Sequence, residues 1–373
     1  MSTRSFLCCV IALLAAACDT TAPSGPRSQA PESAPFGHHT TVVGPGESIQ
    51  AAVDAAQPGD RIFLRPGIYA QSVTIDRAGI ELVGIGRRPP ILENPGGQEN
   101  GITVTAAGAG VEIANLTVRN FEENGILLVG VSGFHLSDVV AENDGEYGLF
   151  PVLSSNGLIE RCSARGHGDA GIYVGQSEHV AVRGSTASGN LSGIEIENSS
   201  DVQVSDNESF DNVAGVLVVL LPGLSVKSSS DLLLTHNNLH DNNRPNPSTE
   251  GIDAFVPTGS GILIVGTDAT DVSANRITGN SFVGVGVANT GLLAELAGVP
   301  IDDIEPFPDH VRVRENTVTG NGGAQPIPFL PPGVDLLWDG TGTGDCWEGN
   351  VFDSSLDLDL PGGAPSPALP GCT

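Results

Sequence analysis

A Gly followed by an aliphatic residue recurs through most of the chain at a nearly constant interval. Successive pairs are 22 to 24 residues apart, except for two gaps of 46 and 49 residues. The pairs begin at Gly101, Gly125, Gly148, Gly171, Gly193, Gly215, Gly261, Gly284 and Gly333. Self-similarity at a fixed period of this size is typical of solenoids, in which each unit buries its apolar face against the next. The repeat therefore predicts a stack of near-equivalent turns.

Each unit contains two or three short segments in which apolar and polar residues alternate, which indicates β-strands. A second apolar pair follows the Gly, as in Phe134/Leu136 and Val180/Val182. A polar corner then ends in Asn or a substitute: Asn120, Asn143, His167, Asn190, Asn212, Asn242, Asn280 and Asn321. Asn tolerates a left-handed backbone, and its amide can donate and accept along a column. We therefore expect an all-β fold, a single parallel β-helix of about 10 coils.

The two long gaps are explained by insertions and not by missing coils. The excess residues fall at the same two corners of two coils, near residues 219–230, 243–259, 289–308 and 322–332. Insertions on successive coils of a repeat protein map to one face, which is often the binding face. They predict a groove walled by loops, with surface decoration as the alternative.

The segments before and after the repeats do not follow the repeat pattern. Residues 41–98 contain a short amphipathic stretch, Ser48–Ala56, which predicts a helix with Ser48 as its N-cap. Such a helix would cover the open edge of the first coil. We assign residues 41–98 to an N-terminal cap and first coils, 99–345 to the repeats, and 346–373 to a C-terminal cap.

The N-terminal segment also carries a family resemblance. Ile49-Gln50-Ala51-Ala52-Val53 followed by Pro66-Gly67-Ile68-Tyr69 resembles the start of many right-handed β-helix proteins of the pectin-lyase-like superfamily. The repeats resemble its "carbohydrate-binding proteins and sugar hydrolases" domain, and residues 169–177 and 193–198 resemble a bacterial β-helix repeat lipoprotein family of undefined activity. The resemblance covers roughly residues 41–373 and implies a right-handed helix. It implies little about chemistry, because one fold hosts many functions.

The extreme N-terminus is expected to direct export. Arg4 precedes an apolar run from Phe6 to Ala17, which is too short to span a bilayer and is typical of a signal peptide. Residues 14–18 resemble a bacterial lipobox in which Cys18 is lipidated, although Leu14 lies four residues before the Cys and not three; an ordinary cleavage site at Ala15–Ala17 is the alternative. We expect a signal peptide over 1–17, a lipid-anchored flexible tether over 18–40, and a lipoprotein facing the periplasm or the cell surface, or a secreted protein without lipidation.

The remaining cysteines are expected to have structural roles. If Cys18 carries lipid, Cys346 and Cys372 are expected to form a disulfide that holds the C-terminus. Cys162 lies in an alternating strand pattern, and we expect it to be a small buried core residue.

Carboxylates gather at outward positions of consecutive coils when residues are counted from the repeat Gly. Glu123, Glu146 and Asp169 stand two residues before it, and stacked acids raise one another's pKa unless a cation intervenes. Residues 143–198 form the best candidate site, with Asp144, Glu146, Phe150, Arg165, His167, Asp169, Tyr173, Gln176, Glu195 and Glu197.

Three roles are assigned within this set. Candidate catalytic residues are Asp169, Glu195 and His167, although His167 occupies the Asn corner position and a structural role is favoured for it. Candidate ligand-binding residues are Glu146, Phe150, Arg165, Tyr173, Gln176 and Glu197. Glu146, Asp169 and Glu195 are candidate calcium ligands, and a solvated acidic face is the alternative. The run Asp339–Asp345 is either a calcium loop or a Gly-rich turn before Cys346.

Charge restricts the partners. With 44 acidic and 16 basic residues the formal net charge is −28, which excludes nucleic acid. The favoured hypothesis is a monomeric envelope lipoprotein that binds a polysaccharide or an envelope protein and contacts membrane only through its lipid. The alternative is a uronate lyase or epimerase that uses coils 143–198, with calcium neutralising the uronate. The absence of polygalacturonase, mannuronan epimerase and pectin methylesterase motifs favours binding.

Overall fold

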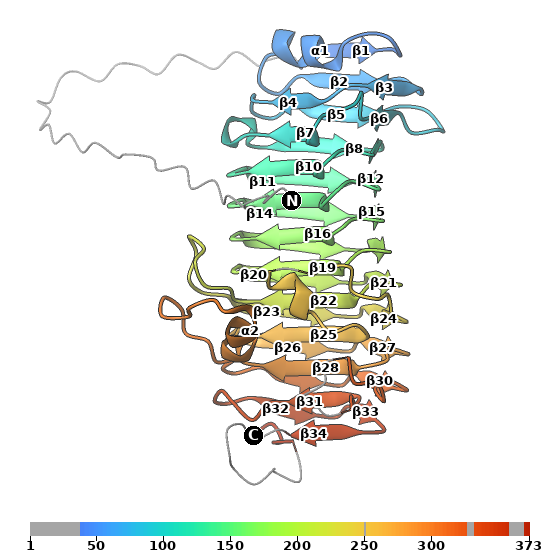
Figure 1. The fold of residues 1–373 in the computed structure, drawn as a ribbon. Helices are drawn as coiled ribbons and strands as arrows, with labels where there is room; N and C mark the ends of the chain where they lie inside the picture. The colour runs from blue at the N-terminus through green and yellow to red at the C-terminus, as the bar shows by residue number, and fades with distance from the viewer. Residues whose placement is uncertain (1–37, 250, 327–331, 358–368) are drawn as a thin grey trace, which may run out of the picture. The chain divides into compact units, whose positions relative to one another are not determined.

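The backbone winds into coils of three strands, and each strand pairs in parallel with its equivalents in the coils before and after (Figure 1). The computed structural model describes residues 38–249, 251–326, 332–357 and 369–373. The expected signal peptide and Cys18, and most of the expected tether, lie outside these residues. The result is a parallel β-helix, as the repeat predicts.

Three parallel sheets run along the stack. Sheet A has 12 strands: β1 (Thr40–Val43), β2 (Arg61–Leu64), β5 (Glu81–Gly84), β8 (Val111–Ala114), β11 (Ser132–Ser137), β14 (Ser155–Glu160), β17 (Glu178–Arg183), β20 (Ser200–Ser205), β23 (Ser230–Thr235), β26 (Thr270–Ser273), β29 (Arg312–Arg314) and β32 (Cys346–Glu348). Sheet B has 11: β3 (Ile68–Ala70), β6 (Ile91–Glu93), β9 (Thr117–Arg119), β12 (Val140–Glu142), β15 (Ser163–Arg165), β18 (Thr186–Ser188), β21 (Glu208–Phe210), β24 (Asn238–His240), β27 (Arg276–Thr278), β30 (Thr317–Thr319) and β33 (Val351–Phe352). Sheet C has 11: β4 (Val73–Ile75), β7 (Asn100–Val104), β10 (Asn124–Val129), β13 (Tyr147–Val152), β16 (Ala170–Gly175), β19 (Ser192–Glu197), β22 (Ala214–Val219), β25 (Ser260–Val265), β28 (Val283–Ala288), β31 (Leu336–Trp338) and β34 (Ser355–Asp357).

The repeat Gly lies next to the residue that fills the interior of each coil. Ile126 pairs with Ile102 on one side and Leu149 on the other, and all three are fully buried. The Gly itself is required by the close approach of the next coil, because a Cβ built on Gly148 would lie 2.5 Å from the Gly171 carbonyl oxygen.

The assignment of Gly333 to this column is wrong. Val285 pairs with Leu336, so Asp335 and not Gly333 follows Gly284 in the column. Gly333 lies in the connection before β31. Gly333-Val334 is followed directly by Asp335-Leu336. The search for a Gly before an aliphatic residue selected the first dipeptide, whereas the structure places the second in the column.

The polar corners contain a continuous ladder of buried Asn side chains. The backbone N–H of Asn190 donates to Asn212 Oδ1 at 2.9 Å, and that of Asn212 donates to Asn242 Oδ1 at 3.2 Å. The ladder consists of Asn190, Asn212, Asn242, Asn280 and Asn321. A second ladder, which the sequence did not single out, follows the strands of sheet A: Asn207, Asn237, Asn275, Asn316 and Asn350.

The corner prediction merges two neighbouring positions. Asn120 and Asn143 have φ of 63° and 56° and lie one residue before the ladder, where Phe121 and Asp144 stand. The ladder residues are not in this left-handed conformation. Asn is therefore used twice, once for its backbone tolerance and once for its amide.

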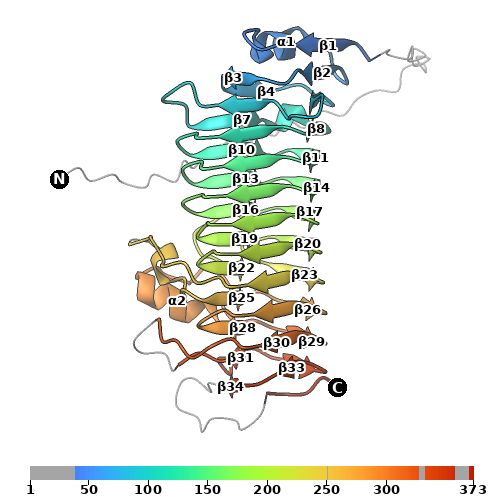
Figure 2. The same cartoon turned by 90° about the vertical axis from the view of Figure 1, so that its right-hand side faces the viewer.

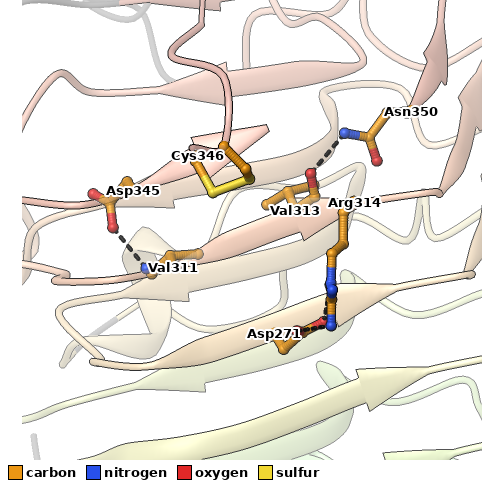
Figure 3. The surroundings of a disulfide bond; sticks show 8 residues. Asp271, Val311, Val313, Arg314, Asp345, Cys346 and Asn350 are labelled. Atoms are coloured by element: carbon orange, nitrogen blue, oxygen red, sulfur yellow. Dashed lines mark hydrogen bonds and ion pairs between the residues drawn. A yellow bond between two sulfur atoms is a disulfide. The ribbon is translucent and has the colours of Figure 1, made fainter. Parts of the chain in front are cut away.

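Both ends of the stack are covered. Helix α1 (Ile49–Ala55) is capped by Ser48, which accepts from the Ala51 N–H, and its Ile49 and Val53 are fully buried against the first coils (Figure 1). At the other end a disulfide joins Cys346 to Cys372 beside β29 (Figure 3). Cys162 is a buried free thiol.

Four long connections interrupt the regular coils. Residues 220–229 and 289–311 connect sheet C to sheet A, and residues 241–259 and 320–335 connect sheet B to sheet C. The 289–311 connection carries helix α2 (Thr290–Ala297), which lies beside β25 and β28 in Figure 2. The 241–259 connection carries the short helix η2 (Asp253–Phe255). Within the part of the chain that the structure describes, no helix is both long enough and apolar enough to cross a membrane.

Candidate functional site

A column of acidic residues runs along one edge of sheet C. Backbone hydrogen bonds join Glu123 to Glu99, Glu146 to Glu123 and Asp169 to Glu146, at 2.9, 2.7 and 3.0 Å. These four residues, here called the acidic column, therefore stack on successive coils, as the repeat register predicts. Neighbouring acids and burial raise the pKa of Glu123 and Glu146.

Three aromatic rings lie beside this column on the outer face of sheet C. The Tyr147 centroid is 4.3 Å from that of Phe150 and 5.0 Å from that of Tyr173, and the Phe150 and Tyr173 centroids are 4.7 Å apart. Tyr147 and Phe150 are half-buried, whereas Tyr173 is 5% exposed. Phe150 and Tyr173 stand beside one another on the paired strands β13 and β16, and Tyr147 is the first residue of β13.

Carboxyl groups continue this face onto the next coil. Tyr173 pairs with Glu195 in the register of β16 and β19, and its hydroxyl donates to Glu197 Oε1 at 2.6 Å. Gly175 makes this possible, because a Cβ there would lie 2.1 Å from the Tyr173 ring. Tyr147 is correspondingly a hydrogen-bond partner of Asp169. Two phenol–carboxyl pairs therefore lie on neighbouring coils.

An insertion supplies a further carboxyl group. Asp253 in η2 adds charge repulsion to the burial that raises the pKa of Asp169, Glu195 and Glu197, and it lines a common cavity with Glu195. Here these four residues are called the carboxyl cluster. Beneath η2, Glu195 and Asp253 line a cavity of about 50 Å³ together with apolar residues of β22 and β25, a space sufficient for a few water molecules.

The insertions cover part of the face that was expected to be an open groove. Val256 from the η2 segment and Leu293 from α2 pack on Leu217, Val219 and Leu263, the outward residues of β22 and β25. The exposed part of the face is therefore upstream, over β13 and the acidic column.

Burial gives the carboxyl cluster unusual protonation. It raises the pKa of Asp169 to about 8 and that of Glu197 to about 7, and it raises the pKa of Glu195 well above its usual range. Asp169 Oδ1 and Glu195 Oε2 are buried without a hydrogen-bond partner among the described residues. Desolvation disfavours the charged form, so carboxyl groups here retain protons near neutral pH and can donate them.

Several predicted site residues do not join this cluster. His167 and Asp144 have fully buried side chains inside the corner, where the His167 N–H donates to Asn190 Oδ1 and the Asp144 N–H donates to His167 Nδ1. Both occupy the Asn ladder position. This is the structural corner role favoured for His167, whereas the expected outward placement of Asp144 is wrong. Burial lowers the pKa of His167 to about 4.

Arg165 and Gln176 also act elsewhere. Arg165 lies on sheet B and pairs with Glu142. Gln176 Oε1 accepts from the N–H groups of Ser225 and Val226 and so holds the 220–229 insertion. Sequence reasoning missed Tyr147, which stands directly before a repeat Gly, and Asp253, whose only signal is its place in an insertion.

The proposed calcium ligands do not converge. Among the described residues, the acidic triplet whose oxygens all lie within 4.8 Å of one another is Asp268, Glu305 and Asp309. Glu146, Asp169 and Glu195 do not form such a group, because Glu146 is exposed whereas Glu195 is buried under η2.

Comparison with known proteins defines the class of fold. Residues 100–221 match the family described as a right-handed β-helix region. Together with the three parallel sheets, this match defines the fold as a right-handed parallel β-helix. No curated protein matches the chain in sequence.

Solved structures resemble it over most of its length. The A-module of mannuronan C-5 epimerase AlgE4 from Azotobacter vinelandii has a TM-score of 0.60 and 17% identity over 84% of this chain and 95% of its own. An alginate lyase from Paenibacillus sp. has a TM-score of 0.52 and 16% identity over 84% and 99%. The lacto-N-biosidase of Eubacterium ramulus has a TM-score of 0.55 and 13% identity over 84% and 64%. At these identities the likeness concerns the fold.

Proposed function

We propose that this protein binds a carbohydrate on the outer face of β13 and β16, beside the acidic column and the carboxyl cluster, which share Asp169. The observation that carries the proposal is the group of three rings, Tyr147, Phe150 and Tyr173, next to carboxyl and phenol groups. Apolar surfaces with a few fixed polar groups are typical of small-ligand sites. The similar solved structures are a mannuronan C-5 epimerase, an alginate lyase and a lacto-N-biosidase, which supports a glycan over other ligands.

The charge of the face selects the kind of glycan. The neighbouring charges that shift the pKa of Asp169, Glu195 and Glu197 are all acidic. A polyuronate would add further negative charge to groups that already repel one another. We therefore propose a neutral or amino-sugar polysaccharide, with hydroxyl or ammonium groups bonded to the acidic column.

The cellular setting remains the one expected from the sequence. We propose export by residues 1–17 and anchoring through lipid on Cys18, with the β-helix held at the cell envelope by the segment before it. Retention of a Cys18→Ser variant in the membrane fraction would contradict the anchor.

Affinity electrophoresis in gels that contain a soluble polysaccharide tests the binding proposal. We expect retardation by a neutral glucan or by chitosan, weaker retardation by alginate, and at least a tenfold loss of affinity, about 1.4 kcal/mol, for Phe150→Ala. The matched control is Phe210→Ala, which removes a ring stacked on His240 at 5.3 Å on sheet B. Equal losses for both variants, or no retardation of the wild-type protein, would contradict the proposal.

The phenol–carboxyl pairs favour a second candidate function, a polysaccharide-active enzyme such as the expected uronate lyase or epimerase. A carboxyl group that keeps its proton near neutral pH can act as a general acid, and a nearby carboxylate can act as a base. Incubation with polyuronates, glucans and chitosan, followed by product separation, tests for turnover. Products lost in Glu197→Gln but kept in Glu178→Gln, an exposed acid of β17, would establish the enzyme.

A further inference from the structure

A second group of acids lies away from this face, where the α2 insertion returns to sheet A. Asp268 stands before β26, and Glu305 and Asp309 stand near the end of the 289–311 insertion. One carboxylate oxygen from each lies within 4.8 Å of the others. Residues 41 positions apart in sequence, Asp268 and Asp309, are adjacent here because their coils stack.

Backbone groups fix the orientation of the three carboxylates. Asp268 Oδ1 accepts from the Asp309 N–H at 3.0 Å, and Glu305 Oε2 accepts from the Phe307 N–H at 3.2 Å. Asp309 Oδ1 accepts from the N–H and hydroxyl of Thr343 at 2.6 and 2.9 Å. Each of these bonds uses one named oxygen, and each carboxylate carries a second one that can bind a cation.

Asp345 supplies an independent indication of a ligand. It is 6% exposed, and its Oδ1 accepts from the Val311 N–H at 2.7 Å (Figure 3). Its Oδ2 is buried without a hydrogen-bond partner among the described residues. Hydrogen bonds place this carboxyl group beside the triplet, because Thr343, two residues before Asp345, donates to Asp309, and Val311, two residues after Asp309, donates to Asp345. A buried oxygen without a partner is costly unless a proton or cation binds it.

A backbone carbonyl lies at the same place. A Cβ built on Gly342 would lie 1.7 Å from the Pro308 carbonyl oxygen and 2.7 Å from Asp345 Oδ2. The two oxygens therefore lie close together beside Gly342, where any side chain would collide with both. Carboxylate and carbonyl oxygens together form the ligand set that Ca²⁺ prefers.

The Gly-rich run itself is a turn and not a calcium loop. Asp339 Oδ1 accepts from the Thr341 N–H and hydroxyl, and its Oδ2 accepts from Asn289. Only the last part of the run, Thr343 and Asp345, faces the acids.

We propose that Asp268, Glu305 and Asp309 bind one divalent cation of the calcium type, with Asp345 and the Pro308 carbonyl at its side. The cation joins three segments that are far apart in sequence: the turn before β26, the end of the 289–311 insertion and the C-terminal run 341–345. It neutralises Asp268, Glu305 and Asp309; the basic residue that acts on Asp268 is His310. Mg²⁺ fits less well, because it demands a compact octahedral shell and usually keeps several waters, whereas Ca²⁺ accepts more oxygen ligands in variable geometry.

Terbium luminescence provides a specific test on the full chain. The two Trp residues of the protein are Trp338 and Trp347, 5.4 Å apart, and Trp338 Nε1 donates to the Thr341 carbonyl within the same run. We expect Trp-sensitised emission that saturates at one Tb³⁺ per chain and is displaced by Ca²⁺ at concentrations at least tenfold lower than by Mg²⁺. Ca²⁺ should also raise the unfolding temperature.

Conservative variants separate binding from folding. Glu305→Gln and Asp309→Asn keep an oxygen for their backbone donors, and both should lower Tb³⁺ affinity at least tenfold with an unchanged circular dichroism spectrum. The control is Asp302→Asn, an exposed acid in the same insertion, which should bind as the wild type does. The proposal is overturned by absent Tb³⁺ emission, by displacement without preference for Ca²⁺, or by equal affinity in Asp309→Asn and Asp302→Asn. None of these results depends on glycan binding.

Discussion

The Asn ladder and the carboxyl cluster are both columns of polar side chains produced by the same stacking, yet their consequences are opposite. Asn212 donates to Asn242 and accepts from Asn190, so each amide satisfies its neighbours. In the carboxyl cluster, Asp169 and Glu195 repel one another and each keeps an oxygen without a partner. Stacking stabilises a side chain that both donates and accepts hydrogen bonds, whereas it destabilises a carboxylate, which only accepts them. The first column stabilises the fold, and the second is retained at a cost in stability, as functional sites often are.

The largest expected effect comes from interrupting the ladder. Asn212→Ala removes the bonds to Asn242, Ala187 and Asn190 and leaves buried amide and carbonyl groups unpaired. We expect the free energy of unfolding to fall by about 3 kcal/mol in urea denaturation. Gln203→Ala, on the exposed face of β20, should change it by less than about 0.5 kcal/mol. Similar losses of unfolding free energy in both variants would show that the Asn ladder does not contribute more to stability than an exposed side chain does.

The carboxyl cluster should make stability depend on pH. Burial raises the pKa of Asp169 from 3.8 to about 8 and that of Glu197 from 4.5 to about 7, so the folded state binds more protons than the unfolded state between these values. Their contribution is therefore fully present below about pH 4 and is lost as the pH rises to about 8. The double variant Asp169→Asn/Glu197→Gln should remove most of this decrease.

Urea midpoints measured from pH 4 to 9, compared between this variant and the wild type, isolate the effect from other groups. Glu178→Gln is the control, since Glu178 is exposed. A variant that keeps the wild-type slope would show that the cluster is already ionised in the folded protein.

A smaller loss of stability is expected when a methyl group is added at Gly175, beside the Tyr173 ring. Gly175→Ala places a methyl group 2.1 Å from the Tyr173 ring and should displace it from Glu197, at about 1–2 kcal/mol of stability. Gly286→Ala, in the same sheet, meets Leu263 at 3.2 Å and should cost less. A crystal structure of Gly175→Ala with the 2.6 Å bond intact would contradict the expected displacement.

The smallest effect is expected in the exposed part of the acidic column. Glu146→Gln removes a charge stacked between Glu123 and Asp169, and we expect a gain of about 0.3 kcal/mol that disappears in high salt. A loss of stability at low salt would indicate that the column already holds a cation.

The coil period, the N-terminal helix and the acidic column could be predicted because each depends on repetition, which sequence displays directly. The corner role favoured for His167 is confirmed, but Asp144 was misplaced because the corner prediction treated two adjacent positions as one. Only three-dimensional stacking distinguishes the left-handed residue from the inward one. Asp253 and the Asp268–Asp309 contact could not be predicted, because residues in insertions have no register against which to count.

The parallel register has a consequence for how such a protein can change. Val152 and Gly175 occupy equivalent places on β13 and β16, so excision of residues 153–175 would join two equivalent points and leave the coils before and after in step. Phe150 would then neighbour Glu195 directly. Adding or removing a whole coil thus changes which residues are neighbours on adjacent coils, but it leaves the surroundings of each residue within its own coil unchanged. New combinations of side chains can therefore arise from duplication or deletion alone.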